Sequence, residues 1–165
     1  MSPSAKIRLR RFFFAYAGIS LLAFADVIVL ERIYKPLSRD YAIPWEALSA
    51  GLSWAPEALW WHIAFLTLAV GIFLLLGLAA RDLLLAAGSL VLFFTGWEDT
   101  IYFAFLREIP PARLPWLDHA WGIAWTRIFQ PSQSVSRYGL LLANIVGFAL
   151  AWIAFGRGAR DRSAV

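Results

Sequence analysis

The sequence predicts an all-α integral membrane protein, a bundle of four transmembrane helices forming a single domain over residues 1–165. Three observations lead to this class: the chain is 61% hydrophobic, only 16% of its residues are charged, and the apolar residues form long runs. A soluble domain of 165 residues cannot bury that much apolar surface, so the excess is expected to face lipid.

The composition also excludes several kinds of site and partner. The chain has no cysteine, which rules out disulfides, zinc–thiolate sites and iron–sulfur clusters. A net charge of +4 is compatible with nucleic-acid binding. The basic residues, however, gather at the ends of the apolar runs, where membrane orientation explains them. We therefore expect membrane lipids, and no nucleic acid, as partners.

The first span is expected at about residues 12–30, a length close to the roughly 20 residues that a helix needs to cross a membrane. It follows a basic group at Lys6, Arg8, Arg10 and Arg11. The alternative is a signal peptide cleaved after Ala25, which would remove residues 1–25, because Ala23-Phe24-Ala25 resembles a cleavage site. Against cleavage, the apolar run continues beyond Asp26.

Further spans are expected at about 58–80, 83–106 and 138–155, with a short turn at Arg81-Asp82. Pro56 is expected to open the first of these three. Basic residues at the N-terminus, in this turn and in the tail share one side, which the positive-inside rule makes cytoplasmic. The sequence thus predicts a location in the cell (inner) membrane, with both termini cytoplasmic and the long connections outside.

Two amphipathic interfacial helices are expected in the outer connections, at about 44–54 and 115–129. Each begins with Pro-Trp, and proline suits the first turn of a helix. The segment 43–54 aligns without gaps with 114–125, which predicts a 2+2 internal repeat of a span–interfacial helix–span unit. The alternative is that outer-leaflet helices favour such starts independently.

The fourth span carries a stripe of small residues at intervals of four. Such stripes let helix backbones approach closely in lipid. The expected partner is another span of the same bundle, and the alternative is a homo-oligomer or a larger membrane complex. The stripe consists of Gly139, Ala143, Gly147 and Ala151.

Each predicted span also places a polar side chain in its outer half, whereas the inner half has almost none. Ionisable groups at such depth are expensive and are therefore candidates for function. At 1.5 Å per residue, Glu98 lies about 13 Å below the boundary marked by Arg107. An ion or proton pathway would need more polar residues in the inner half than the sequence offers. The outer-half residues are Asp26, His62, Glu98 with Asp99, and Asn144.

The candidate catalytic residues are Glu98, Asp99 and Tyr102. Glu98 and Tyr102 are one turn apart and share a helix face. Two adjacent carboxyls in a low dielectric are costly to ionise together, which suits acid/base chemistry. The structural alternative is that the pair holds an arginine, such as Arg127 or Arg137.

His62, Glu98, Asp26 and His119 are the candidate metal ligands. Carboxylates together with imidazole suit zinc, iron or manganese, so a divalent metal is the cofactor expected if one is bound. The alternatives are that His62 bridges helices and that His119 forms a surface pair with Asp118. HExxH, GxSxG and phosphate-binding glycine loops are absent from the sequence.

The segment Glu98-Asp99-x-x-Tyr102 resembles the acidic motif of the small membrane lycopene cyclases, proline-x-Glu-(Glu/Asp)-x-x-Phe. Gly96 stands at the proline position and Tyr102 at the phenylalanine position. The likeness covers seven of 165 residues. It implies that an acid pair inside lipid can protonate an apolar alkene.

Two functions from different classes remain open. The first is a membrane-embedded enzyme that acts on a lipid or isoprenoid substrate in an outward-facing acidic pocket, by acid/base or metal-assisted chemistry. The alternative is a non-catalytic accessory subunit or ligand-binding protein of a larger membrane complex.

Overall fold

The computed structural model describes residues 2–34, 56–118, 120–129 and 134–157. Within these ranges no strand occurs beyond an isolated antiparallel bridge between Arg113 and Ser136, so the all-helical architecture is confirmed. In chain order the elements are α1 (Pro3–Val27), the π-helix η1 (Ile28–Tyr34), α4 (Pro56–Ala79), α5 (Leu83–Phe94), α6 (Trp97–Leu106), the 3-10 helix η2 (Pro115–Leu117), α7 (Trp121–Ala124), the 3-10 helix η3 (Trp125–Phe129) and α8 (Arg137–Gly156).

Two of the described helices are long and apolar enough to cross a membrane, namely Ser4–Arg32 and α8. A third crossing results if the bent pair α5–α6 counts as one span. In α4, the segment Phe65–Ala79 is apolar but shorter than these spans. The structure thus supports two or three spans, and the fourth, at about 58–80, stays a prediction.

α1 begins well before the predicted residue 12. The Ser2 side chain caps it by accepting a hydrogen bond from the Ala5 N–H, and Pro3 occupies the first turn. The basic residues that precede the apolar run therefore lie on the helix itself. The helix continues without a break through Ala25 and Asp26, and cleavage there stays a prediction.

α4 opens at Pro56, as the sequence predicts, and a tight turn joins it to α5. Arg81 adopts a left-handed conformation with φ of 50°. The Asp82 side chain then caps α5 by accepting a hydrogen bond of 3.2 Å from the Leu85 N–H. The predicted turn at Arg81-Asp82 is confirmed.

The predicted span over 83–106 is not one straight helix, because α5 and α6 meet at an angle of 63°. Gly96 takes a left-handed conformation (φ 86°), which glycine adopts at little cost. The Thr95 hydroxyl donates to the carbonyls of Val91 and Leu92, so it satisfies oxygens at the end of α5. These two residues interrupt the helix.

The single interfacial helix predicted over 115–129 is three short segments, η2, α7 and η3. Ala120 has an extended backbone that separates η2 from α7. The Asp118 carboxylate accepts a hydrogen bond of 2.7 Å from the Val135 N–H and so ties this region to the start of α8. The other predicted interfacial helix, at 44–54, lies outside the described residues, and with it one copy of the proposed repeat.

α8 confirms the predicted helix over 138–155, with Ser136 as its cap. The small-residue stripe faces other helices of the same chain: Ala143 and Ala151 are fully buried. Any side chain at Gly147 would collide with Thr95, next to the helix break. A partner subunit that uses the stripe would have to displace these contacts, and the oligomer stays a prediction.

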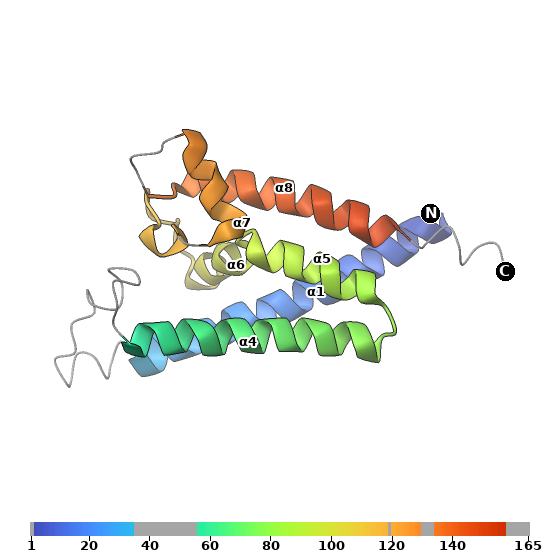
Figure 1. Cartoon of the computed structure of the whole chain (residues 1–165), viewed down its shortest axis with the longest axis horizontal. Coiled ribbons are helices and arrows are strands. Elements are labelled where there is room, and N and C mark those ends of the chain that lie inside the picture. The colour runs from blue at the N-terminus through green and yellow to red at the C-terminus, as the bar shows by residue number, and fades with distance from the viewer. Residues whose placement is uncertain (1, 35–55, 119, 130–133, 158–165) are drawn as a thin grey trace.

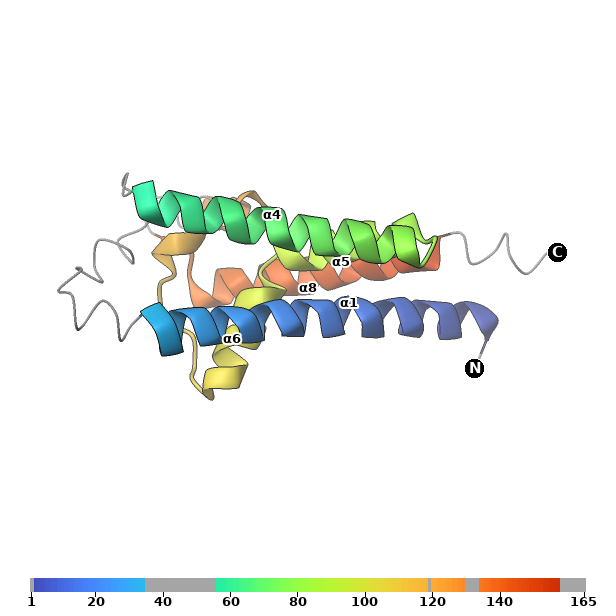
Figure 2. The same ribbon diagram turned by 90° about the horizontal axis from the view of Figure 1, so that it is seen from below.

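The helices pack side by side so that the start of α1, the α4–α5 turn and the end of α8 share one end of the bundle (Figures 1 and 2). We call this the termini end, and the opposite end, with η1, η2 and η3, the loop end. α1 contacts α5, α6 and α8, while α5 packs between α4 and α8. The membrane location, with both termini cytoplasmic, stays a prediction.

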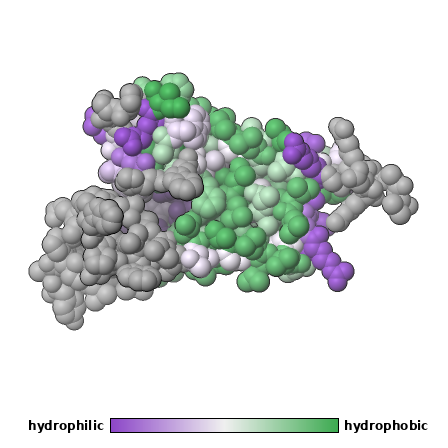
Figure 3. Space-filling view, in the orientation of Figure 1, coloured by the Kyte–Doolittle hydropathy of each residue, from purple (hydrophilic) through white to green (hydrophobic). Residues whose placement is uncertain are grey.

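A belt of apolar side chains covers the middle of the molecule, between polar groups at the two ends (Figure 3). Large hydrophobic residues are exposed along all the long helices, among them Phe13, Leu21, Leu75, Leu83 and Ile153. An apolar band of this extent matches what a lipid-facing surface requires.

Candidate acidic site at the helix break

The break between α5 and α6 determines where the two predicted catalytic carboxyls lie. Glu98 and Asp99 fall in the first turn of α6, immediately after Gly96. Carboxylates are favoured at that position because of the partial positive charge of a helix N-terminus. α6 itself packs against α1.

Glu98 is the most deeply placed of these carboxyls, with only 8% of its surface exposed. Its Oε1 atom is buried and has no hydrogen-bond partner in the part of the chain that the structure describes. Asp99 and Asp26 both lie close enough to act on it electrostatically. Asp99 of α6 and Asp26 of α1 are thus the two carboxyls that act on the buried Glu98.

Asp99 is held from the loop end. The indole N–H of Trp116, in η2, donates a hydrogen bond of 3.1 Å to Asp99 Oδ1. Pro115 starts η2 and so positions this indole beside α6. The sequence predicted Asp99 as a site residue but gave no reason to select Trp116 as its partner.

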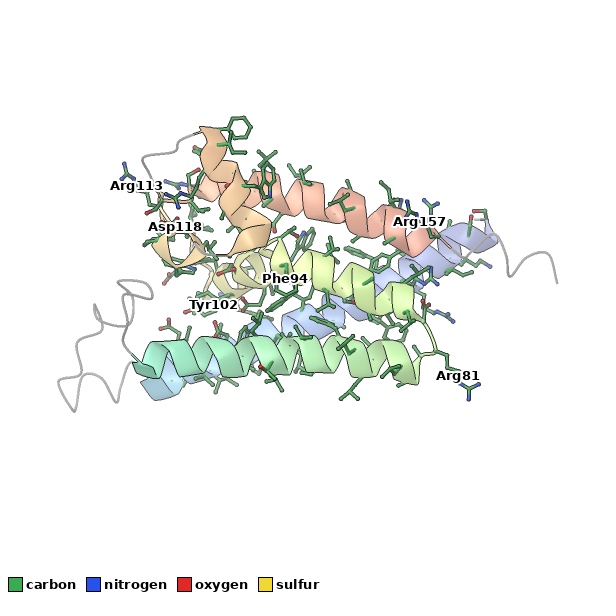
Figure 4. All side chains as sticks on the ribbon, viewed as in Figure 1. Arg81, Phe94, Tyr102, Arg113, Asp118 and Arg157 are labelled. Carbon is green, nitrogen blue, oxygen red and sulfur yellow. The ribbon has the colours of Figure 1, made fainter. Side chains whose placement is uncertain are left out.

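Tyr102 lies one turn beyond Glu98 and is hydrogen-bonded to a residue of η1. Its hydroxyl donates a hydrogen bond of 2.8 Å to Glu31 Oε1 (Figure 4 labels Tyr102). Glu31 belongs to the π-helix η1, and it also lies within electrostatic range of Asp26. Glu31 lies just beyond the predicted first span and was not among the predicted site residues. In the structure it accepts the hydrogen bond of the candidate residue Tyr102.

Asn144, the polar residue predicted in the fourth span, contacts the same turn of α6. Its side-chain amide donates a hydrogen bond to the Thr100 hydroxyl, and its backbone carbonyl accepts one of 3.0 Å from the Trp97 indole. Its Oδ1 atom is buried without a partner among the described residues. Asn144 therefore links α8 to α6.

The predicted metal ligands are only partly described. The side chain of His62 and the whole of His119 lie outside the described residues. Among the residues that the structure does describe, no three His, Cys, Asp or Glu side chains are grouped so as to hold a metal ion. The divalent metal bound by His62, Glu98, Asp26 and His119 stays a prediction.

A cavity of about 170 Å³ lies elsewhere at the loop end, between η3 and the start of α8. Thr126, Ser136 and Tyr138 are among its lining residues, and none of the acidic residues lines it. The acidic site is defined by buried carboxyls and not by this cavity.

A buried ion pair at the termini end was not predicted. Arg11 and Asp82 are 5% and 7% exposed, and the Arg11 Nε lies 2.7 Å from Asp82 Oδ2. The sequence assigned both residues to the membrane boundary and expected almost no polar group in the inner half. The signal available was an arginine directly before the first apolar run and an aspartate in a very short turn.

No protein-family model matches the chain, and comparisons with curated proteins and with solved structures give no match either.

Proposed function

We propose that this chain is a membrane-embedded enzyme whose carboxyls Glu98, Asp99 and Asp26 transfer a proton to or from a lipid or isoprenoid substrate. The observation that carries the proposal is the buried, unpartnered Oε1 of Glu98. A buried oxygen without a hydrogen-bond partner lowers the stability of a fold. Its presence here therefore suggests a functional role for Glu98.

The surroundings of Glu98 suit proton transfer. A buried carboxylate without a counter-ion is expensive, and two neighbouring carboxyls raise that expense. A proton shared among these carboxyls lowers the free-energy cost of their burial, and a proton held in this way is available to a substrate. Tyr102 and Trp116 fix the geometry through their hydrogen bonds to Glu31 and Asp99.

An apolar surface beside the site supports a lipidic substrate. The rings of Phe24 and Phe105 meet edge to face at 5.8 Å between centroids and bridge α1 and α6. Both are about half exposed, at 48% and 47%. A hydrocarbon chain that approached from lipid would meet these rings on the same two helices that carry Asp26 and Glu98.

The second candidate function is an accessory subunit of a membrane complex. It is favoured by large apolar side chains that project from the loop end. Because they stand at or beyond the ends of the long helices, a partner protein could cover them. They are Ile109, Ile128, Phe129 and Tyr138, each more than 70% exposed.

The proposal is tested by incubating the purified chain in vesicles with a total lipid extract and comparing the lipids by mass spectrometry. We expect conversion of at least one lipid species by the wild-type chain and its loss in Glu98→Gln. Glu108→Gln is the matched control, since Glu108 is exposed just beyond α6. An unchanged lipid pattern with the wild-type chain, or equal conversion by Glu98→Gln, would overturn the proposal and favour the accessory role.

A further inference from the structure

Two arginines one turn apart on α1 differ in what they contact at the termini end. Arg11 is held by partners within the chain: its Nε and Nη2 donate to the Asp82 carboxylate. Its Nη1 donates to the backbone carbonyls of Phe155 and Arg157 at the end of α8. Four of its five N–H donors are therefore used inside the fold.

Arg8 faces α8 as well but holds no such partner. Its guanidinium carbon lies 5.8 Å from the centre of the Trp152 ring, in a cation–π arrangement. It also packs onto Gly156, where any Cβ would collide with it. The Arg8 Nε is buried and has no hydrogen-bond partner among the described residues. Packing thus positions the guanidinium, while its Nε donor has no acceptor in the described part of the chain.

An oriented guanidinium of this kind suits a phosphate group. Its planar fork offers parallel N–H donors that match two phosphate oxygens, and stacking on an aromatic ring fixes that plane in advance. Arg81 and Arg157 stand at the same end of the bundle (Figure 4). They add positive charge to this end of the bundle, which raises the local concentration of anions.

The surface next to Arg8 indicates that the phosphate belongs to a lipid. A ladder of aromatic rings runs from Trp152 along the α1–α8 boundary, away from the termini end. Phe148 stacks on Trp152 at 5.8 Å, Phe12 meets Phe148 at 5.4 Å, and Tyr16 stacks on Phe12 at 6.1 Å. Phe148 and Tyr16 are exposed, so an acyl chain can lie along them.

We propose that Arg8 binds the phosphate of an anionic membrane lipid at the termini end, with an acyl chain lying on the Trp152–Phe148–Tyr16 surface. This proposal rests on the membrane location that is part of the proposed function. It is independent of the acidic site, which lies towards the opposite end of α1.

The test is native mass spectrometry of the full chain in detergent, titrated with phosphatidylglycerol and, separately, with phosphatidylcholine. We expect phosphatidylglycerol to bind more tightly, and Arg8→Gln to weaken its binding about five- to tenfold, as expected for one charge-assisted contact. Arg10→Gln is the matched control: it removes the same charge from an exposed position on the same helix and should change binding less than about twofold.

Trp152→Leu supplies a second variant if Arg8→Gln fails to fold, and it too should weaken binding because the guanidinium loses its stacking partner. Equal binding by Arg8→Gln and Arg10→Gln, or by the two lipids, would overturn the site. Displacement of the lipid by inorganic phosphate at matched concentration would assign the site to free phosphate and would overturn the proposal that its ligand is a lipid.

Membrane location is measured separately, by alkaline carbonate extraction. Extraction of the chain would overturn the membrane location and the proposed function with it. A chain that stays in the membrane while Arg8→Gln binds lipid normally would overturn only the lipid site.

Discussion

Arg11 and Asp82 lie 71 residues apart in the chain and form a two-point ion pair, with Nε–Oδ2 and Nη2–Oδ1 distances of 2.7 and 2.9 Å. The same guanidinium binds the carbonyls of Phe155 and Arg157. One side chain therefore joins α1, the α4–α5 turn and the end of α8. This contact holds the three elements together at the termini end, whereas the acidic site lies towards the loop end.

Breaking the ion pair should destabilise the bundle. Asp82→Asn leaves the buried Arg11 charge uncompensated, which typically costs about 3–5 kcal/mol. We expect a fall of that size in the free energy of unfolding, measured by denaturant titration in detergent. Arg10→Gln, at an exposed position, should change it by less than about 0.5 kcal/mol. Wild-type stability in Asp82→Asn would contradict the structural role.

Gly96→Ala should destabilise the helix break. A residue with a Cβ costs about 1–2 kcal/mol in the left-handed conformation. The added carbon would also collide with Leu140 and Ile123. Gly71→Ala is the control, because no atom lies within 4 Å of the Cβ position at Gly71. We expect that variant to be neutral or slightly more stable in thermal unfolding. If the two variants unfolded alike, the break would not depend on Gly96.

Tyr102→Phe removes the hydroxyl that donates to Glu31 and should lower the free energy of unfolding by about 1 kcal/mol. Tyr138→Phe is the comparison, since Tyr138 is exposed on α8. The lipid-conversion assay should respond to the first variant only, because Tyr102 joins α6 to η1 beside Glu98. Equal behaviour of the two variants would remove Tyr102 from the site.

The predicted topology can be tested by cysteine labelling, for which a chain without cysteine is well suited. Arg81→Cys and Arg113→Cys place single thiols at exposed positions at opposite ends of the bundle (Figure 4). We expect an impermeant maleimide to label Arg113→Cys in intact cells and Arg81→Cys only after lysis. The reverse pattern would invert the orientation.

The helix positions were predictable because apolar length and capping are local properties. Pro56, the Arg81-Asp82 turn and the α8 boundaries follow from neighbouring residues. The break at Gly96 was missed, although Thr95-Gly96 stands inside the apolar run. Its cause is partly tertiary: Thr95 fits against Gly147 of α8, a contact that no local pattern reveals.

The site was predictable in its acids and not in their partners. Glu98 and Asp99 stood out because charges inside an apolar stretch are expensive. Glu31 is hydrogen-bonded to Tyr102 from 71 residues away and Trp116 to Asp99 from 17 residues away, and no spacing rule links such positions. The role of Arg11 was not predicted. A basic residue at the end of a span normally indicates the orientation of the span in the membrane, whereas Arg11 forms a buried ion pair with Asp82.

The central claim is that Glu98 takes part in proton transfer to a lipidic substrate. The most direct measurement is to run the lipid incubation in heavy water and follow deuterium in the products by mass spectrometry. The account predicts that the wild-type chain introduces solvent deuterium at a carbon position, that Glu108→Gln does the same and that Glu98→Gln does not. Products without deuterium, or equal incorporation by Glu98→Gln, would contradict it.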